Sequence, residues 1–365
     1  MPRILVAPDK FRDSLTATQA AEAIARGSRA AGAFVDICPV ADGGEGTLDT
    51  LTSLMSSSVI GVISRGPMGV PVRAHVGVME DGTGIVELAQ SSGLSLVETA
   101  KRSPLQATTH VTGECIKAAL ARGAKRLVVG LGGSATMDAG IGMARALGVG
   151  FYDRHGKPVG EGIEALEQTA LVDLAGLDRR LAGVDVLAAC DVMLPLKGSA
   201  HAFGPQKGAT APEIDRVEDA LARFAGVFAE QTGIQIDGVT GGGAAGGTGA
   251  MLHALGARLE SGASVVLEAI NFRERMAGID LVITGEGTLD QTSLAGKAAG
   301  IVASYAEEAG IPVVALVGAN RLDQGPFKEV RSLEEHFGGD LREARTRAAA
   351  GLQAVAARLY SDLFH

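Results

Sequence analysis

Apolar and polar residues alternate along this chain in the pattern of strands followed by helices. An apolar run at residues 3–7 predicts a strand, apolar residues at helical spacing over 16–29 predict a helix, and residues 35–40 predict a second strand. Such a strand–helix–strand opening predicts a parallel sheet with a right-handed crossover. The segment 279–317 repeats the same order, so the parallel sheet is expected to be completed near the end of the chain.

The segment from Val59 to Leu88 has a different pattern. Its three β-rich runs are separated by the short turn sequences RGPMG and EDGTG, and this close spacing predicts hairpins. We therefore expect a second, mixed-sheet domain inserted into the first. Within it, residues 127–129 and 184–189 predict buried strands and residues 212–231 a long helix.

The last segment, 341–364, predicts an amphipathic closing helix. Leu352, Val355, Leu359 and Leu363 fall on one face at helical spacing. This face could dock on the core of its own chain or on another copy, so a homo-oligomer stays open at this point.

Composition narrows the class of protein. The chain has 365 residues with a hydrophobic share of 46%, which is enough apolar material for two domains. A net charge of −9 argues against a nucleic-acid partner, and no apolar run approaches the ~18 to 20 residues needed to cross a membrane. Three widely spaced cysteines and an opening strand with no signal-peptide pattern predict a reduced, cytoplasmic protein.

A glycine-rich loop with the sequence GLGGSATMDAGIG follows the strand at 127–129 and precedes an apolar helix. Glycines let backbone N–H groups approach an anion, and Ser134 or Thr136 could cap the helix that follows. Asp138 would then stand in the first helical turn. The alternative is that the glycines serve close packing and that Asp138 only complements the helix dipole.

Acidic residues recur just past the predicted strands. They are Asp42, Glu45, Asp138, Asp191, Glu286 and Asp290. Phosphoryl transfer needs carboxylates to hold Mg²⁺ or orient a hydroxyl, with donors and cations for the phosphates, and Lys10, Arg12, Lys207 and Lys297 lie in neighbouring loops. Simpler readings remain open, since Asp42 and Glu45 match a capping box and Glu286 and Asp290 could form surface salt bridges.

Other classes of function also match parts of the sequence. Gly130, Gly132 and Ala135 satisfy GxGxxA after a strand, with Asp153 about twenty residues further on, as in NAD-dependent oxidoreductases of small hydroxy acids. A second pattern at Gly241 follows a poor strand and is discounted. Walker A and protein-kinase motifs are absent from the sequence. A non-catalytic sensor of small phosphorylated acids is a third reading.

Several long motifs in order resemble the type I glycerate kinase family, bacterial enzymes that phosphorylate D-glycerate with ATP. The matching segments are PDKFRDSLTATQAAEAI, PVADGGEGT, GLGGSATMDAGIGMARALG, ACDVMLPLKG, FGPQKGA, GGGAAGGTGA and DLVITGEGTLDQTSLAGK. The family usually reads SATNDGG, CDVxNPL and GKxP, where this chain has Met137 with Ala139, Leu194 and Ala298.

The resemblance implies an α/β fold in which a second α/β mixed-sheet domain is inserted into a Rossmann-like parallel-sheet domain. We expect residues 1–64 plus 265–365 in the first and 65–264 in the second, with the active site in the cleft. The implied product is 2-phosphoglycerate, and the implied cofactors are ATP and Mg²⁺.

On this basis we assign expected roles. Asp191 is the expected general base, with Lys297 and Asp138 as further catalytic residues, and Glu286 and Asp290 are the expected metal ligands. Expected glycerate-binding residues are Lys10, Arg12, Ser14, Asp42, Gly43, Gly44 and Glu45. Expected nucleotide-binding residues are Gly132, Gly133, Ser134, Thr136, Gly285 and Gly287.

Overall fold

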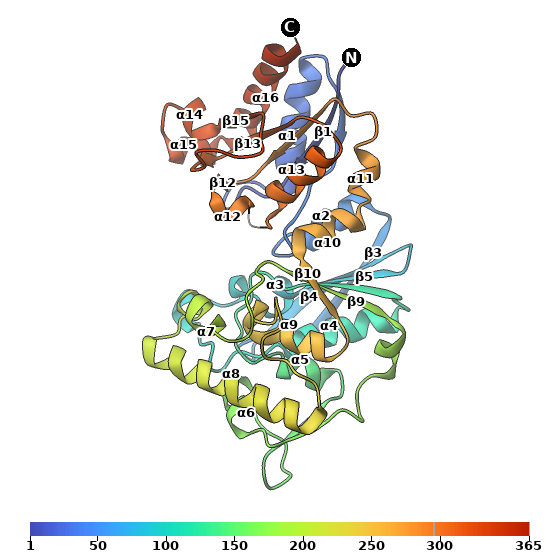
Figure 1. Ribbon diagram of the computed structural model, residues 1–365, viewed down its shortest axis with the longest axis vertical. Coiled ribbons are helices and arrows are strands. Elements are labelled where there is room, and N and C mark those ends of the chain that lie inside the picture. The colour runs from blue at the N-terminus through green and yellow to red at the C-terminus, as the bar shows by residue number, and fades with distance from the viewer. Residues whose placement is uncertain (295, 365) are drawn as a thin grey trace. The chain divides into compact units, whose positions relative to one another are not determined.

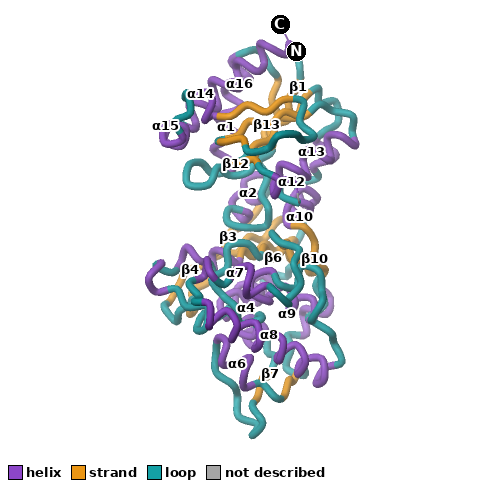
Figure 2. The backbone as a smooth tube through the Cα atoms, turned by 60° about the vertical axis from the view of Figure 1, so that its left-hand side comes forward, coloured by secondary structure: helices purple, strands orange, loops and turns teal. Residues whose placement is uncertain are grey.

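The computed structural model describes residues 1–294 and 296–364, and these form two compact units. Unit 1 comprises Met1–Asp42, Asp49–Met55 and Gly262–His365, and unit 2 comprises Gly43–Leu48 and Ser56–Ser261. Each unit has its own sheet flanked by helices (Figures 1 and 2). The predicted α/β fold, with a parallel sheet in one domain and a mixed sheet in an inserted one, is confirmed.

Unit 1 is built on a five-stranded sheet in which every neighbouring pair is parallel. In spatial order the strands are β15 (Glu329–Ser332), β13 (Val313–Val317), β11 (Leu281–Gly285), β1 (Arg3–Pro8) and β2 (Phe34–Ile37). The chain turns from β1 toward β2 on one side and reaches β11 on the other. The carboxyl ends of β1 and β11 therefore form the switch point at which open parallel sheets bind ligands.

Alternate residues of the unit 1 strands face two helical layers. Val314 and Leu316 belong to the core shared with α1 (Ala17–Ala30) and α16 (Ala348–Phe364), whereas Ala315 and Val317 pack with Ala299 of α13 (Ala298–Glu308). The remaining short elements are α10 (Gly262–Ala269), α11 (Phe272–Arg275), α12 (Gln291–Leu294), α14 (Leu333–His336), α15 (Leu341–Thr346), β12 (Thr288–Leu289) and β14 (Ala319–Asn320).

The helix expected at the end of the chain docks on its own core. Leu352, Val355 and Leu359 of α16 are buried in the cluster that also contains Ala20 and Ile24 of α1. The apolar face of α16 is thus covered within unit 1.

Unit 2 is built on a six-stranded mixed sheet. Its spatial order is β10 (Arg258–Ser261), β9 (Asp185–Cys190), β6 (Arg126–Gly130), β5 (Thr83–Glu87), β4 (Pro71–Met79) and β3 (Ser57–Arg65). The first four strands are parallel, and β3, β4 and β5 form the expected antiparallel hairpins. The helices are α3 (Leu88–Ser92), α4 (His110–Ala121), α5 (Ile141–Ala146), α6 (Gly162–Gln168), α7 (Ser199–Phe203), α8 (Ala211–Thr232) and α9 (Ala244–Ala254).

The boundaries of the units differ from the expected ones by a few residues. The expected break after residue 64 falls inside β3, which pairs with β4 along its whole length and therefore belongs to unit 2. At the other end, 262–264 begin α10 in unit 1. The helix α2 (Thr47–Leu54) starts in unit 2 and continues in unit 1.

No helix in the described part of the chain is long and apolar enough to span a bilayer.

Candidate active site

The switch point of the unit 1 sheet carries buried ionisable side chains. Asp9 directly follows β1, and its backbone N–H donates to the carbonyl of Gly285 at the end of β11 at 2.8 Å. Asp9 is only 7% exposed. Because Glu286 comes next after Gly285, the chain directions alone bring two carboxyl groups to this edge of the sheet.

A lysine and a third carboxylate complete this group. Lys10 Nζ lies 3.3 Å from Asp42 Oδ1. Burial, followed by the negative charge of Asp42, raises the pKa of Asp9 to about 7, although the charge and the backbone N–H of Lys10 oppose this shift. Burial lowers the pKa of Lys10, but Asp9 and Asp42 outweigh that effect, so its pKa is raised and the side chain stays cationic. We call Asp9, Lys10, Asp42 and Glu286 the carboxylate cluster.

Glu286 has the character expected of a ligand-binding carboxylate. Burial raises its pKa to about 7, while a hydrogen bond from Ser293 and the charge of Lys297 counter part of that shift. Its Oε1 atom is buried and has no hydrogen-bond partner among the described residues. A buried carboxylate oxygen without a partner calls for an explanation, and a cation or a substrate hydroxyl would supply one.

Asp290, the other expected metal ligand, is engaged differently. Its Oδ1 accepts from the backbone N–H and the hydroxyl of Thr292 and from the N–H of Ser293 at the start of α12. The Thr292 hydroxyl accordingly lowers the pKa of Asp290. Among the described residues no group of three His, Cys, Asp or Glu side chains is arranged to hold a metal ion. Mg²⁺ is commonly held by one or two carboxylates plus substrate phosphates, and Glu286 fits that mode.

The remaining expected site residues of unit 1 differ in exposure and in the contacts that they make. Arg12 is exposed, and the Ser14 hydroxyl donates to the carbonyl of Arg345 at 2.8 Å. A Cβ at Gly285 would lie 1.9 Å from the carbonyl oxygen of Leu316, and one at Gly287 would lie 3.2 Å from the N of Arg12. Gly285 is therefore required for strand packing. Ala295, which stands between the expected site residues Gly287 and Lys297 in the sequence, lies outside the described residues.

In unit 2, the two glycine-rich loops lie against each other. The N–H of Gly132 donates to the carbonyl of Gly43 at 3.2 Å, and a Cβ at Gly132 would lie 2.5 Å from the Cα of Gly44. A Cβ at Gly130 would lie 2.6 Å from the carbonyl oxygen of Gly43. Because the two backbones approach so closely, only glycine fits at positions 130 and 132. These glycines therefore serve close packing, and this role is compatible with anion binding by the same loop.

Asp191 joins this arrangement at the end of β9. A Cβ at Gly132 would lie 3.2 Å from Asp191 Oδ2, and the Asp191 side chain is exposed. An exposed carboxylate beside a glycine loop is accessible to a small substrate.

The alternative interpretation of Asp42 and Glu45 as a capping box is wrong. Helix α2 begins only at Thr47, and its first N–H groups are bound from elsewhere: the carboxylate of Glu87 accepts from Gly46 N at 3.1 Å and from Leu48 N at 2.9 Å. Glu87 is 1% exposed and comes from the end of β5. It fixes the Gly43–Leu48 segment in unit 2, a role that sequence spacing alone did not reveal.

The predicted caps Ser134 and Thr136 are also wrong. Helix α5 begins at Ile141 because Ala139 and Gly140 have φ angles of 49° and 73°, which no helix continues. The N–H groups of Gly140 and Gly142 instead donate to the buried Asp138 carboxylate, which also accepts from the N–H and hydroxyl of Thr109. Burial raises the pKa of Asp138 more than these bonds lower it. The predicted catalytic residue thus holds two helix starts together.

Ser134 and Thr136 are bound by a buried lysine. Lys207 Nζ donates to Ser134 Oγ at 2.7 Å and to the carbonyl of Thr136 at 2.8 Å. The sequence shows Lys207 only as one of several cations in loops that follow strands. Its burial, at 3% exposed, could not be read from the sequence FGPQKG.

The GxGxxA segment that begins at Gly130 lacks the strand that a dinucleotide-binding fold requires before Asp153. Strand β7 (Gly150–Tyr152), which would have to extend the parallel sheet before Asp153, pairs antiparallel with β8 (Leu171–Asp173) in a separate sheet. Asp153 accepts from the N–H groups of His155 and Lys157 in a turn. The NAD-dependent alternative therefore has no support.

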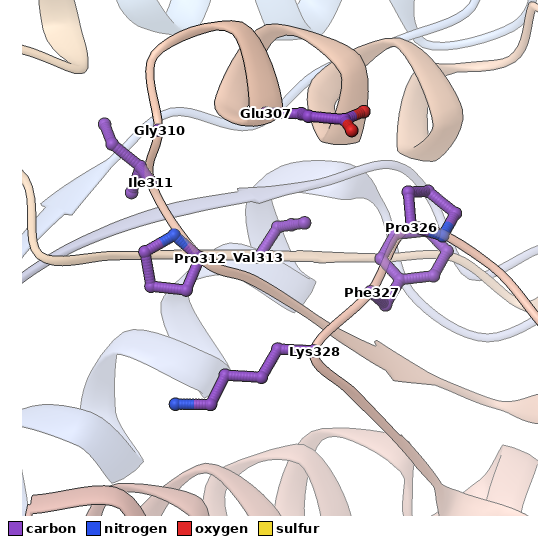
Figure 3. A pocket seen from close by; sticks show the side chains of 8 residues that line it. All are labelled: Glu307, Gly310, Ile311, Pro312, Val313, Pro326, Phe327 and Lys328. Carbon is purple, nitrogen blue, oxygen red and sulfur yellow. The ribbon is translucent and has the colours of Figure 1, made fainter.

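A surface pocket of about 480 Å³ lies elsewhere in unit 1 (Figure 3). Gly310–Val313 and Pro326–Lys328 line it together with Glu307 of α13. Gly310–Val313 lead into β13, and Pro326–Lys328 lead into the parallel strand β15 at its amino end. The carboxylate cluster instead follows the carboxyl ends of β1 and β11. The pocket and the cluster are on opposite edges of the same sheet.

Comparison with known proteins decides among the remaining readings. The sequence profile of the glycerate kinase family matches residues 4–363. The chain belongs to the glycerate kinase family.

Its relatives support this assignment over most of their length. The chain is 45% identical over 324 residues to the glycerate kinase of Bacillus subtilis, covering 87% of this chain and 85% of the relative. It is 40% identical over 331 residues to the glycerate 2-kinase of Escherichia coli, covering 88% and 87%. A crystal structure provisionally named glycerate kinase 2, from Salmonella typhimurium LT2, matches with a TM-score of 0.87 and 37% identity, covering 99% of this chain and 98% of that one.

As a member of the glycerate kinase family, the chain is a kinase, and the predicted family and enzyme class are confirmed. The roles of individual residues remain predictions.

Proposed function

We propose that this kinase transfers the terminal phosphoryl group of ATP to the 2-hydroxyl of D-glycerate, giving 2-phosphoglycerate. The observation that carries the proposal is the group of ionisable side chains at the switch point of the unit 1 sheet, in a chain of the glycerate kinase family. Buried carboxyls beside a lysine suit a small, anionic hydroxy acid and a metal–nucleotide complex, and they have no evident structural use.

Residues of unit 1 supply the cationic anchor and the carboxylates. Lys10, held beside Asp42, is the proposed partner of the glycerate carboxylate, with the exposed Arg12 as a second cation. Glu286 would hold Mg²⁺, which neutralises phosphate charge when it is bound. Lys297, whose charge acts on Glu286 and Asp290, would offset charge that develops on the transferred group.

Residues of unit 2 supply the base and the phosphate loop. The exposed Asp191 is the proposed acceptor of the proton from the attacking hydroxyl. The loop from Gly132 to Thr136 would bind nucleotide phosphates, and Asp138 would act by positioning that loop.

The experiment is a coupled assay for ADP with D-glycerate, ATP and Mg²⁺, in which the product isomer is identified by phosphorus NMR. We expect ADP release that depends on D-glycerate, with 2-phosphoglycerate as product. Formation of 3-phosphoglycerate would contradict the proposed position of transfer, and absence of ADP release with D-glycerate would contradict the substrate.

Asp191→Asn tests the proposed base. The exposed amide preserves size and fold but cannot accept the proton, so kcat should fall by about 10² to 10⁴ fold with an unchanged melting temperature. Asp185→Asn, an exposed aspartate at the opposite end of β9, is the matched control and should retain wild-type turnover. Near-normal kcat in Asp191→Asn would remove this residue from the role of base.

A further inference from the structure

A lysine is buried beneath the glycine-rich loop of unit 2. Lys207 ends the short 3-10 turn Pro205–Lys207 and is 3% exposed. Burying an ammonium group is costly unless it is well paired, and a buried lysine without a clear structural need is an indicator of function. Neither of its two hydrogen-bond acceptors, Ser134 Oγ and the Thr136 carbonyl, is a carboxylate.

The loop that Lys207 holds is itself incompletely paired. Thr136 is 0% exposed, and no group among the described residues pairs with its hydroxyl. A buried hydroxyl without a hydrogen-bond partner lowers the stability of the folded protein, so stability alone does not account for this loop. The arrangement is that of a loop held in one conformation for a ligand.

Two carboxylates act on the charge of Lys207, and an arginine binds the residue next to it. The carboxylates of Asp191 and Asp138 act on it from the end of β9 and from the start of α5, and Arg102 Nη1 lies 3.5 Å from the carbonyl of Gln206 next to it. Burial lowers the pKa of Lys207 to about 8, and the two aspartates counter only part of that shift. The side chain can therefore lose its proton within the working range of an enzyme.

We propose that Lys207 is a positioning residue of the nucleotide site: it fixes the Ser134–Thr136 turn and places one buried positive charge behind the loop that binds nucleotide phosphates. This inference rests on the proposed function. Its ligand class is a nucleoside di- or triphosphate, and its action passes through the loop and not through direct contact.

The test is the affinity for ADP, measured by isothermal titration at pH 6.5 to 9.5 with excess Mg²⁺. In the wild-type protein Kd should increase about tenfold as the pH rises through about 8, since the neutral amine no longer offsets phosphate charge. Lys207→Met should bind ADP at least tenfold more weakly at pH 7 and should lack the alkaline loss of affinity. The KM for D-glycerate should change less than twofold.

Lys157→Met is the matched control, because Lys157 is exposed in the same unit. It should keep wild-type affinity and pH dependence. A purely structural role for Lys207 would lower the melting temperature of Lys207→Met but leave its pH dependence like that of the wild type, and that result overturns the inference. If Lys207→Met does not fold, the wild-type titration decides alone: constant ADP affinity from pH 6.5 to 9.5 overturns it.

Failure of this inference and failure of the proposed function are distinguishable. Unchanged ADP affinity in Lys207→Met with normal phosphorylation of D-glycerate by the wild type rejects only the role of Lys207. The expected pH dependence without any phosphorylation of D-glycerate supports Lys207 and rejects the proposed substrate.

Discussion

At the scale of single residues, ionisable groups that look alike in the sequence differ in how deeply the fold buries them. Asp9 and Asp13 belong to one charged loop, PDKFRDS, yet Asp9 is 7% exposed while Asp13 is exposed. Lys10, Asp42 and Glu286 could be predicted as site residues, because polar residues after apolar strands mark the binding edge of a parallel sheet. Asp9 could not, because the depth of a side chain depends on neighbours from distant segments, here Gly285.

Asp9→Asn should change how stability depends on pH. The pKa of Asp9 is about 7 in the folded protein against 3.8 as the reference, so the folded state binds the proton more tightly than the unfolded chain. The stabilisation by this proton is complete below about pH 4 and is lost as the pH rises toward 7. Because asparagine cannot ionise, the free energy of unfolding of Asp9→Asn relative to wild type should rise between pH 5 and pH 8 by on the order of 2 kcal/mol.

Urea unfolding at several pH values measures this difference. Asp13→Asn, the exposed neighbour in the same loop, is the control and should follow the wild type at every pH. Parallel curves for Asp9→Asn and wild type would mean that Asp9 is already ionised in the folded protein at pH 5.

The structure also shows where two residues that depart from the family pattern lie. Met137 stands where the family usually has asparagine, and it is 0% exposed in the core of unit 2. Ala139 stands where glycine is usual and has a φ of 49°. The first change replaces a polar group by core packing, and the second places an L-residue in a left-handed conformation that costs about 1 kcal/mol.

At the scale of elements, glycine-mediated contacts hold the starts of α4 and α5 together. A Cβ at Gly142 would lie 2.3 Å from Thr108 Oγ1 and 2.7 Å from His110 N, and the Gly142 N–H donates to Asp138. Because Gly142 has no side chain, the backbones at the starts of α4 and α5 can approach closely enough for the Asp138 carboxylate to bind both. The hydrophobic pattern predicts the strand, loop and helix here but not the residue at which the helix begins, since the left-handed conformation of Ala139 and Gly140 leaves no mark in that pattern.

Gly142→Ala should therefore be destabilising, by about 2 to 4 kcal/mol. Gly226→Ala is the matched control, because Gly226 lies in the exposed middle of α8 and a Cβ there meets nothing within 4 Å. The same chemical change should stabilise the protein there by about 0.5 to 1 kcal/mol. Thermal or urea unfolding measures both, and a stabilising effect of Gly142→Ala would contradict the contacts described.

At the scale of the whole molecule, the chain divides into two compact units that do not share a core cluster. The insertion of one mixed-sheet domain into a parallel-sheet domain could be predicted, since hairpin spacing in the sequence differs clearly from strand–helix alternation. The bounds could not, because the hydrophobic pattern is continuous across β3 and shows only that 57–65 is a strand, not which sheet it joins.

Separate cores predict separate unfolding. Leu352→Ala removes a buried side chain from the unit 1 core and Leu221→Ala from the unit 2 core, each at a cost of about 2 to 5 kcal/mol. Hydrogen exchange followed by mass spectrometry should show faster exchange in β1, α1 and α16 for the first variant and in β6 and α8 for the second. Equal acceleration throughout the chain in both variants would indicate a single cooperative unit.

The short segment Gly43–Leu48 limits how this molecule can be dissected. It belongs to unit 2 although residues of unit 1 stand on both sides of it in the sequence. A recombinant fragment of residues 56–261 would leave the Glu87 carboxylate without its two amide donors and would open a gap over Gly130 and Gly132. The inserted domain is consequently not a detachable module, and a fragment of it should need the missing hexapeptide, added in trans or fused by circular permutation, to regain its native form.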